Sequence, residues 1–565
     1  MHCSLACDLA VAAGAKDALV PDYPPAEGSR TRGRLCFRGH YVSALAGHGA
    51  RLSSAWVHNG SIRETSPAEA VKLAAVKLRD AARANSLAVL VDGNFPCEET
   101  AKAVSFARER LQCSAVAVYV PPADEELLKG LGDAPTVGLE KVSEAATVLA
   151  VGDVFSTHPV LAGFILDAIG RTKQGKLLAI DSTIGRTMRF AAKGYLVRPG
   201  TEGALLAAIA RAAGARPDGH GHPEETLAAL SRRTGVDEGA AAEIVSDLRA
   251  TPGSVVAISL PAGRVDSPAA CAAALAAIGQ KGVAQILPLC ASGNARGALA
   301  VATALGAMPF GNWLSQLLTR PAAVILCIGT DLLGSAPGGI MQAIFGGADT
   351  VIAAASMPSA TTARADIILP LAGWYETAGT LISPAGERIS FGALSPPPGG
   401  APSPGELADE LAGHIEGPTR SAAGFDVARL DTALPTPTGL EADAAPVPDG
   451  GFVMVSRTEH YELPEPGVSR QLAWVRLMEC EPVAVLGSAD AEGLGLRRGD
   501  SVRVSGADGS AELRLDVSDA VPPGVMATPL GLGSTKDLFP WKVRANGLVG
   551  IGPASARIVA AQSSE

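Results

Sequence analysis

Residues 148–183 read VLAVGDVFSTHPVLAGFILDAIGRTKQGKLLAIDST. The apolar runs 148–151 and 177–180 have the length of buried strands, and the stretch between them is long enough for a helix. This order predicts a strand–helix–strand unit with parallel strands. The first run ends in Gly152-Asp153 and the second in Asp181-Ser182-Thr183. Because ligands bind beyond the carboxyl ends of parallel strands, these polar residues are candidate cofactor-binding residues.

The alternation of strands and helices continues on both sides of this unit. Ser66-Pro67-Ala68-Glu69 matches a capping box with proline at the first helical position, and it predicts a helix that ends near residue 84. A predicted strand over 323–328 is followed by Gly329-Thr330-Asp331, so Gly329 and Asp331 join the candidate cofactor-binding residues. The pattern predicts an α/β fold with parallel, Rossmann-like sheets. Further strands are predicted over 88–91, 115–120, 254–260 and 351–354.

The chain changes character after residue 394. Residues 395–450 are rich in Pro, Ala and Gly and contain one short helical piece. They are predicted to be a linker. Short strands beyond it, at 500–504, 511–517 and 524–527, predict a small β-barrel over residues 451–565. The predicted organisation is an N-terminal segment (1–60), α/β domains (61–394), the linker and the barrel.

Composition excludes several classes of protein. The chain has 565 residues, 47% hydrophobic and 18% charged, which is typical of a globular protein with more than one core. With a net charge of −10 and no Lys/Arg stripe, nucleic acid is not an expected partner. No uninterrupted apolar run reaches the ~18 residues of a membrane span. The first residues lack the features of a signal peptide, so we expect a cytoplasmic protein.

The cysteines suggest a metal site near the N-terminus. An odd count in a large chain argues against a disulfide framework. Cys3 and Cys7 are close in sequence and Cys36 follows at a distance, as in iron–sulfur sites that combine one loop with a remote thiolate. Zinc is an alternative, although it prefers Cys-x-x-Cys pairs. Three unrelated buried cysteines are the other alternative, and the spacing leaves all three interpretations open.

Three stretches resemble the molybdopterin oxidoreductase superfamily. Residues 365–370, 374–380 and 386–388 are similar to its segment Ala-Asp-hydrophobic-Leu-Pro, Glu-x-x-Gly-Thr and Glu-Gly-Arg, with the last triplet inverted here. Residues 488–500 resemble its dinucleotide-binding pattern, and we expect them to form a hairpin with Gly499-Asp500 at the turn. Cys3 to Asp8 and Cys36 to His40 resemble the [4Fe–4S] motif in the catalytic subunit of formylmethanofuran dehydrogenase, whose first cysteine falls one position before Met1.

The resemblance implies a set of cofactors and contacts. It implies a [4Fe–4S] cluster on Cys3, Cys7 and Cys36, and a bis-molybdopterin guanine dinucleotide centre with molybdenum or tungsten. For His158 a satisfied buried histidine is the alternative interpretation, and for Asp181 a plain turn at the end of a strand. The cofactor-binding residues that it implies, with those at the strand ends, are Gly152, Asp153, His158, Asp181, Ser182, Thr183, Gly329, Asp331, Glu376 and Thr380.

One departure concerns the metal ligand. Residues 93–99 are similar to the family's segment before its metal-ligand loop, where a Cys or selenocysteine some twenty residues later ligates the metal. The matching stretch here, 117–123, offers no Cys, Ser, His or Asp before Asp124. Cys97 or Cys113 takes the role in a shifted alignment, with a buried structural thiol as the alternative. Asp124-Glu125-Glu126 is interpreted as a solvated helix start.

Two functional hypotheses follow. In the first, the chain is an oxidoreductase subunit of a hetero-oligomeric one-carbon complex that interconverts a formyl group and CO2 and passes electrons through the cluster. In the second, it is a catalytically degenerate scaffold subunit of a formyltransferase/hydrolase complex or of a complex I-like assembly. Other protein subunits are the expected partners in both.

Overall fold

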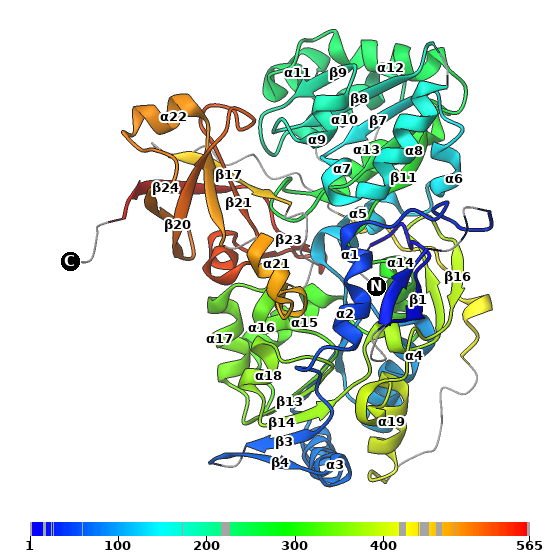
Figure 1. Ribbon diagram of the computed structural model, residues 1–565, viewed down its shortest axis with the longest axis vertical. Coiled ribbons are helices and arrows are strands. Elements are labelled where there is room, and N and C mark those ends of the chain that lie inside the picture. The colour runs from blue at the N-terminus through cyan, green and yellow to red at the C-terminus, as the bar shows by residue number, and fades with distance from the viewer. Residues whose placement is uncertain are drawn as a thin grey trace.

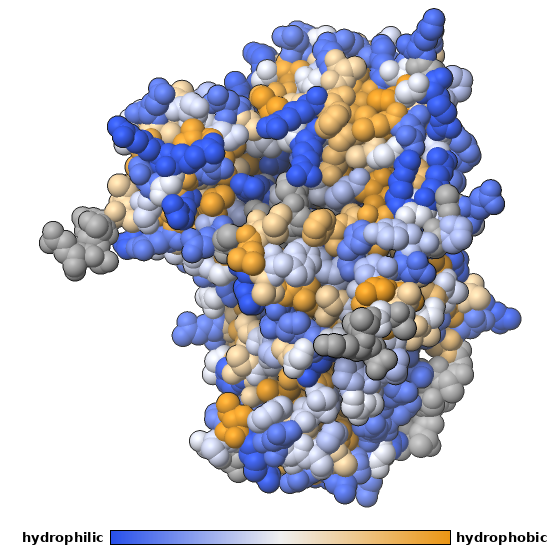
Figure 2. All heavy atoms as spheres, in the orientation of Figure 1, coloured by the Kyte–Doolittle hydropathy of each residue, from blue (hydrophilic) through white to orange (hydrophobic). Residues whose placement is uncertain are grey.

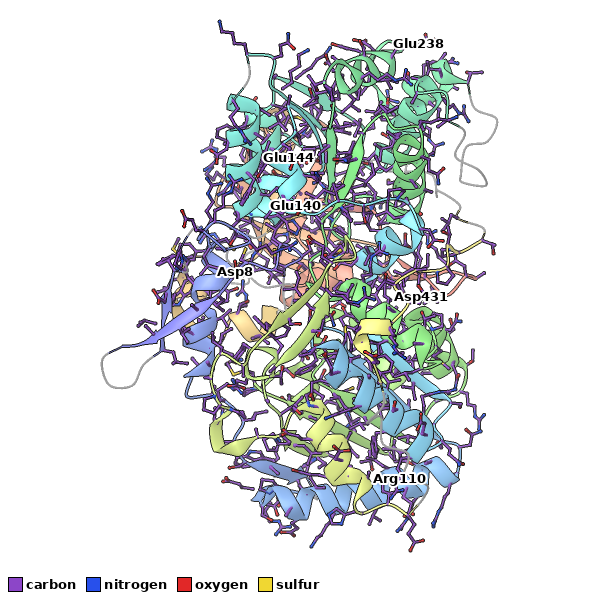
Figure 3. All side chains as sticks on the ribbon, turned by 90° about the vertical axis from the view of Figure 1, so that its right-hand side faces the viewer. Asp8, Arg110, Glu140, Glu144, Glu238 and Asp431 are labelled. Carbon is purple, nitrogen blue, oxygen red and sulfur yellow. The ribbon has the colours of Figure 1, made fainter. Side chains whose placement is uncertain are left out.

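The structure is a computed structural model and consists of two α/β lobes, a β-barrel and an N-terminal segment (Figure 1). The barrel and the N-terminal segment lie alongside the junction of the lobes. Arg110 and Glu238 lie toward opposite ends of the molecule, and Asp8 of the N-terminal segment lies between them (Figure 3). The structure describes residues 3–14, 19–23, 25, 27–58, 60–171, 173–215, 226–416, 425–438, 440, 451–458, 466–478 and 481–561.

The first lobe is built on a seven-stranded sheet of order β4-β3-β14-β13-β12-β5-β6. Its five strands from β14 to β6 are parallel, and the hairpin β3–β4 adds an antiparallel edge. The parallel strands are buried along most of their length, as expected for a parallel sheet covered on both faces. The strands are β3 (Ala55–His58), β4 (Ile62–Thr65), β5 (Leu87–Asp92), β6 (Ala115–Tyr119), β12 (Val324–Ile328), β13 (Thr350–Ala355) and β14 (Ile367–Pro370).

Helices cover both faces of this sheet. The helix predicted after Ser66 is present. Ser66 caps its first turn, since the Ser66 hydroxyl accepts a hydrogen bond from the backbone N–H of Glu69 at 3.2 Å. The helices are α3 (Pro67–Arg83), α4 (Cys97–Ser105), α5 (Pro122–Leu131), α14 (Ala295–Ala304), α15 (Phe310–Thr319), α16 (Leu332–Ser335), α17 (Gly338–Gly346) and α18 (Ala360–Arg364).

The second lobe is built on a five-stranded parallel sheet of order β11-β10-β7-β8-β9. It contains the strand–helix–strand unit predicted from residues 148–183. Its strands are β7 (Thr147–Val151), β8 (Lys176–Asp181), β9 (Lys193–Leu196), β10 (Val255–Ile258) and β11 (Gln285–Pro288). Its helices are α6 (Leu139–Val142), α7 (Val154–Thr157), α8 (Pro159–Gly170), α9 (Arg186–Phe190), α10 (Glu202–Ala212), α11 (Leu227–Thr234), α12 (Ala240–Ala250) and α13 (Pro268–Gln280).

The predicted C-terminal β-barrel is also present. It is closed, with the order β17-β21-β18-β20-β19-β24. Its strands are β17 (Phe452–Arg457), β18 (Val483–Leu486), β19 (Ser501–Ser505), β20 (Ser510–Val517), β21 (Val525–Pro529) and β24 (Ala554–Ala560). The shorter elements around it are α20 (Pro466–Ser469), α21 (Ala473–Met478), η6 (Gly533–Leu538), β22 (Lys542–Val543) and β23 (Val549–Gly550).

The prediction of a hairpin over residues 488–500 is wrong. Ser488–Gly493 forms the helix α22, and β18 before it pairs in parallel with β20, so no two adjacent strands meet at Gly499-Asp500. The reason is that β18 pairs with β20, farther along the chain, and that the Asp490 carboxylate on α22 accepts a hydrogen bond from the N–H of Gly524 at 2.8 Å. Gly499, with φ +93°, only leads the chain into β19.

Part of the predicted linker is packed against the first lobe. Within residues 395–450, the helix α19 (Pro404–Ala412) buries Leu407 and Leu411. The N–H of Gly405 donates to the Glu99 carboxylate at 2.8 Å. Leucines four residues apart share one face of a helix, and this apolar face holds the segment in place. No helix in the described ranges has the length and apolar character needed to cross a bilayer.

Candidate functional site

A cavity of about 390 Å³ lies between the carboxyl ends of the second-lobe strands and the barrel. We call it the sheet–barrel cavity, and Figure 2 shows a recess between the barrel and the second lobe on this side of the molecule. Its lobe wall contains Gly152, Asp153, Asp181, Thr183, Glu202 and Arg264, and its barrel wall contains Val485, Asp516, Ser518, Ala520, Val521 and Ala527. A ligand there would touch both domains.

A buried ion pair between Asp181 and Arg264 spans one side of this cavity. One Asp181 oxygen pairs with the Arg264 guanidinium and also accepts the N–H of Thr183 at 3.1 Å. Arg264 further donates to the backbone oxygen of Ser456 on the barrel at 3.1 Å. The second Asp181 oxygen, Oδ2, is buried and has no hydrogen-bond partner among the described residues. An acceptor left open in this way suits an N–H or O–H donor of a ligand.

The cavity also holds a second buried carboxyl group and further guanidinium groups. Burial raises the pKa of Glu202 to about 7, although the nearby Arg264 opposes the rise. Arg186 and Arg189, both on α9, line the mouth of the same cavity. Carboxylates accept from ribose hydroxyls and guanine N–H groups, and guanidinium groups bind phosphate in pairs of hydrogen bonds. The set of side chains therefore fits a nucleotide with a pyrophosphate.

Gly152 and Asp153 shape this cavity more than they offer contacts to a ligand. Gly152 has φ +84°, and a Cβ there would lie 2.1 Å from the backbone oxygen of Ser259. The Asp153 carboxylate accepts from Ser156 Oγ at 2.6 Å and from Thr187 N at 2.9 Å. Burial alone would raise the pKa of Asp153, but these hydrogen bonds hold it below its ordinary value. Asp153, predicted as a cofactor contact, thus positions the first turn of α9.

A second cavity, of about 230 Å³, adjoins the first and lies between the two lobes. We call it the inter-lobe cavity. It is mostly apolar, with Pro121, Pro122, Leu260, Leu289, Trp541 and Ile551 among its lining residues. Its polar lining includes Cys3, Arg38, Asn94, Asp124 and His158. The two cavities share Thr157, Ser259, Leu260, Pro261, Ser456 and Arg457, so one extended ligand can reach both.

Asp124-Glu125-Glu126 is buried, which corrects the predicted solvated helix start. The three residues are between 1% and 6% exposed. Asp124 accepts the backbone N–H groups of Ala291 and Ser292 at 3.1 and 2.8 Å, and burial raises its pKa to about 7. Glu125 pairs with Lys129, and Glu126 pairs with Arg544. Backbone donors and Arg544 from other segments, together with Lys129 on the same helix, make the burial of these carboxylates tolerable.

His158 is the satisfied buried histidine that the sequence left as an alternative. Its Nε2 lies 3.0 Å from the backbone oxygen of Cys290 and 3.2 Å from Ser4 Oγ, and its Nδ1 lies 3.0 Å from Thr157 Oγ1. Burial lowers its pKa to about 4. A neutral His158 therefore holds the loop of Cys3 against the end of β11, and its contact with a cofactor stays a prediction.

This pKa predicts an effect of pH on stability. The folded imidazole stays neutral while the unfolded one takes up a proton below pH ~6.5, so the contribution of His158 is full above that pH and is lost toward pH ~4. The loss expected across this window is about 3 kcal/mol. Urea unfolding at several pH values should show a smaller loss in His158→Gln than in the original chain. Parallel profiles of the two proteins would contradict the assignment.

The structure brings Cys3, Cys7 and Cys36 together. Burial raises the pKa of Cys3 to about 12 and raises that of Cys7 well above its ordinary value, and in each case the neighbouring thiols add to the rise. The loop of Cys7 is held by Asp8, which accepts from Ser29 Oγ at 2.7 Å and from Arg30 N at 2.6 Å. Even so, the His, Cys, Asp and Glu side chains in the described ranges form no group of three or more placed to hold a metal ion. The iron–sulfur cluster stays a prediction.

Six other predicted residues line neither cavity. Ser182 is buried behind the cavity wall, beside Glu202. Glu376 forms a buried ion pair with Arg51, and the N–H of Thr380 donates to Glu98 at 2.8 Å. The remaining ones, Gly329, Asp331 and Cys97, are packed within the first lobe, where the Cys97 thiol contacts Asn294 at 3.4 Å and burial raises its pKa to about 12. All six side chains or backbone groups contact other parts of the protein at these positions. Their roles as contacts to a cofactor or metal stay predictions.

Three arginines of the cavity, Arg264, Arg186 and Arg189, are not among the residues predicted from the sequence. Arg264 lies in the loop after β10, and its partner Asp181 is 83 residues away. The strand predicted over 254–260 was the available signal, because a cation just after a strand in a parallel sheet lies at the ligand-binding edge. Arg186 and Arg189 follow Asp181-Ser182-Thr183 closely and could have been included on the same ground.

Comparisons with known proteins agree with this architecture. Residues 465–558 match the family model described as Molydopterin dinucleotide binding domain. The whole chain has a fold similar to that of acetylene hydratase from Pelobacter acetylenicus, with a TM-score of 0.73, 14% identity, and 99% of each chain covered. No curated protein matches the sequence. The predicted α/β fold with parallel sheets and a C-terminal β-barrel is confirmed. The match of residues 465–558 supports a molybdopterin cofactor.

Proposed function

We propose that this chain is a molybdopterin-dinucleotide-binding subunit of a one-carbon oxidoreductase complex, similar to the catalytic subunit of formylmethanofuran dehydrogenase. The sheet–barrel cavity carries the proposal. One wall presents Asp181 and Glu202 with Arg186, Arg189 and Arg264. Most of the other wall lies between residues 485 and 527, inside the range that matches the dinucleotide-binding family, and Ser456 to Thr458 complete it. A dinucleotide bound there would be enclosed by both walls.

The residues of the cavity divide the recognition of such a cofactor between them. Asp181 Oδ2 would accept an N–H or O–H group of the nucleotide, and Arg186 and Arg189 would neutralise its phosphates. The adjoining inter-lobe cavity would receive the pterin end, because the two cavities share a wall. When bound, the cofactor supplies the two-electron redox chemistry at its metal.

The inter-lobe cavity has groups that suit a small one-carbon substrate. The pKa of Asp124 of about 7 lets its carboxyl group accept or donate a proton near neutral pH. Arg38 lies on the same wall and donates to the backbone oxygen of Thr157 at 2.9 Å. A formyl group oxidised to CO2 with one water releases two electrons and two protons. Asp124 is the proposed proton acceptor. Cys3, Cys7 and Cys36 are the residues that would hold the predicted cluster, which would supply electron transfer if it is bound.

A scaffold role is the second candidate, and a specific observation favours it. Pro121, Pro122 and Ala123 line the inter-lobe cavity where the family resemblance implies a metal-ligand thiolate. Both oxygens of Asp124, the next residue, already accept backbone N–H groups. The thiols of Cys3 and Cys290 also line this cavity, but neither belongs to the segment where the resemblance implies the metal ligand.

Quantitation of cofactors separates these functions. Protein purified without oxygen from cells that make molybdopterin would be analysed for pterin, tungsten, molybdenum and iron, and assayed for formyl-dependent reduction of a viologen dye. The redox proposal expects pterin, one metal and about four iron atoms for each chain. Folded protein that contains pterin but no molybdenum or tungsten, and reduces no dye, would leave the scaffold role. Folded protein without pterin would contradict the cofactor proposal itself.

A further inference from the structure

The two lobes offer two topologically equivalent places for a nucleotide. In each parallel sheet the strand order reverses at one pair of neighbours, which is β12 and β5 in the first sheet and β7 and β10 in the second. Ligands of open α/β sheets bind outside the carboxyl ends of the strands at such a reversal point. The two reversal points can therefore be compared residue by residue.

At the second-lobe reversal point the position is open. Gly152 follows β7, and Ser259 follows β10. Both residues line the sheet–barrel cavity of about 390 Å³. On the barrel side, the N–H of Ile184 donates to the backbone oxygen of Ala520 at 2.8 Å and forms a rim of this cavity. The strand ends at this point therefore face a volume that a ligand can fill.

At the first-lobe reversal point an aromatic ring fills the corresponding position. Gly329 follows β12, with φ +80°, and a Cβ there would lie 2.3 Å from Cε2 of Phe95 and 3.1 Å from the Cβ of Asp92. Phe95 comes shortly after the end of β5 and is 4% exposed. Its ring therefore packs on the glycine backbone between the two strand ends, where a nucleotide would otherwise lie.

The polar group at this position is also committed to the protein. The Asp331 carboxylate accepts from the N–H of Gly334 at 3.2 Å, and from the N–H and hydroxyl of Thr361 at 2.9 Å each. It caps α16 and ties it to α18. Asp153, which follows Gly152 at the second-lobe reversal point, is committed in the same way to Ser156 and Thr187. The open acceptor of the second lobe is Asp181, at the end of the neighbouring β8, which keeps one buried oxygen without a partner among the described residues.

The barrel closes the first-lobe position from outside. Lys536 on η6 donates to the backbone oxygen of Leu333 on α16. Asp537 on η6 accepts the N–H of Gly338 at the start of α17, at 2.6 Å. These contacts join the barrel directly to the helices beyond β12. The barrel also bonds to the second lobe through Arg264 and Ile184, but there it leaves the larger cavity, of about 390 Å³. The space that it leaves beside Asn94 of the first lobe is the smaller, mostly apolar inter-lobe cavity of about 230 Å³.

We propose that this chain holds one pterin dinucleotide, in the sheet–barrel cavity, and that Phe95, Asp331 and the η6 contacts close the second position. The inference rests on the proposed cofactor-binding function and sets its stoichiometry. It differs from the two dinucleotides of a bis-molybdopterin centre, which the family resemblance implies. The guanidinium groups suited to a pyrophosphate also lie at the second-lobe position, since Arg186, Arg189 and Arg264 all line the sheet–barrel cavity.

Counting nucleotides for each chain tests this directly. Protein purified from cells that make the cofactor would be examined by native mass spectrometry, and its guanine nucleotide and pterin would be quantified after acid denaturation. We expect one of each per folded chain. Two per chain would overturn the inference and leave the proposed function standing. No nucleotide or pterin on folded chains would contradict both.

A blocking variant tests the location. Ala520→Trp places an indole in the sheet–barrel cavity, and we expect it to lower nucleotide occupancy to below about one tenth, because a bound ligand cannot share that volume. Ala507→Trp, on an exposed turn between β19 and β20 of the same barrel, is the matched control and should keep full occupancy. If Ala520→Trp fails to fold, Thr183→Trp blocks the opposite wall. Full occupancy in a folded blocking variant would overturn the assigned location.

Discussion

Replacing Arg264 by alanine is expected to lower the free energy of unfolding by about 3–5 kcal/mol and to release a dinucleotide from the sheet–barrel cavity. The Arg264 and Asp181 side chains are 11% and 3% exposed, so the variant leaves a buried carboxylate without its cation. It also removes the counter-charge of Glu202 and the hydrogen bond to Ser456 that joins the second lobe to the barrel. Urea unfolding of the cofactor-free protein and nucleotide quantitation would measure the two effects separately.

An exposed ion pair on the barrel provides the control for Arg264. Arg503 and Glu512 lie 2.7 Å apart, with side chains that are 56% and 59% exposed. Because water screens such a pair, Arg503→Ala should change stability by less than about 1 kcal/mol and leave cofactor occupancy unchanged. Arg264→Lys keeps the charge but loses the forked geometry of the guanidinium group. We expect its loss of stability to lie between those of Arg264→Ala and Arg503→Ala. An Arg264→Ala protein as stable as the control would show that the pair contributes nothing.

Replacing Arg51 by alanine should also destabilise the protein by about 3–5 kcal/mol. Arg51 and Glu376 form a two-point ion pair, with Nη2–Oε2 and Nη1–Oε1 distances of 2.6 and 2.8 Å. Their side chains are 3% and 0% exposed. Arg51 also donates to the backbone oxygen of Ser356 at 3.0 Å, so it joins the N-terminal segment to the loops that follow β13 and β14. Removing it leaves the Glu376 carboxylate buried in the core of these contacts.

The matched control for Arg51 is an arginine on the hairpin edge of the first lobe. Arg63 and Glu69 are 66% and 60% exposed and lie 3.4 Å apart. Arg63→Ala should change the free energy of unfolding by no more than about 0.5 kcal/mol. The double variant Arg51→Met with Glu376→Leu should recover part of the stability that Arg51→Ala loses, since it leaves no unpaired charge. Equal stability of Arg51→Ala and Arg63→Ala would refute the argument.

The predicted strands were found because the signal for each lies within a few residues. The run before Gly152-Asp153, the run before Asp181 and the helix that starts after Ser66 all appear where the sequence placed them, although only the N-cap half of the predicted capping box forms, because the Glu69 carboxylate bonds Thr65 instead. Apolar runs of strand length and side-chain caps act locally, so a short window of sequence contains most of the information.

The incorrect predictions have a common cause. Asp124 was interpreted as solvated because acidic residues at the start of a helix usually face water. It is buried because Ala291 and Ser292, far along the chain, supply two N–H donors. The turn at Gly499-Asp500 was interpreted as a hairpin, but β18 pairs with β20 across the barrel. In both cases the deciding partner lies outside any local window.

By itself, the sequence determined the alternation of strands and helices and most of the parallel strands, though not β9, β11 or β14. It also determined the C-terminal barrel and the polar residues at the strand ends, because these follow from local periodicity and turn chemistry. Only the tertiary structure decided which strand ends are open to a ligand. Gly152 and Gly329 look equivalent in the sequence, yet one borders a cavity and the other lies under the ring of Phe95. That difference arises from close packing between segments that are distant in the chain. Such packing produces no periodic pattern in the sequence, so a local reading cannot detect it.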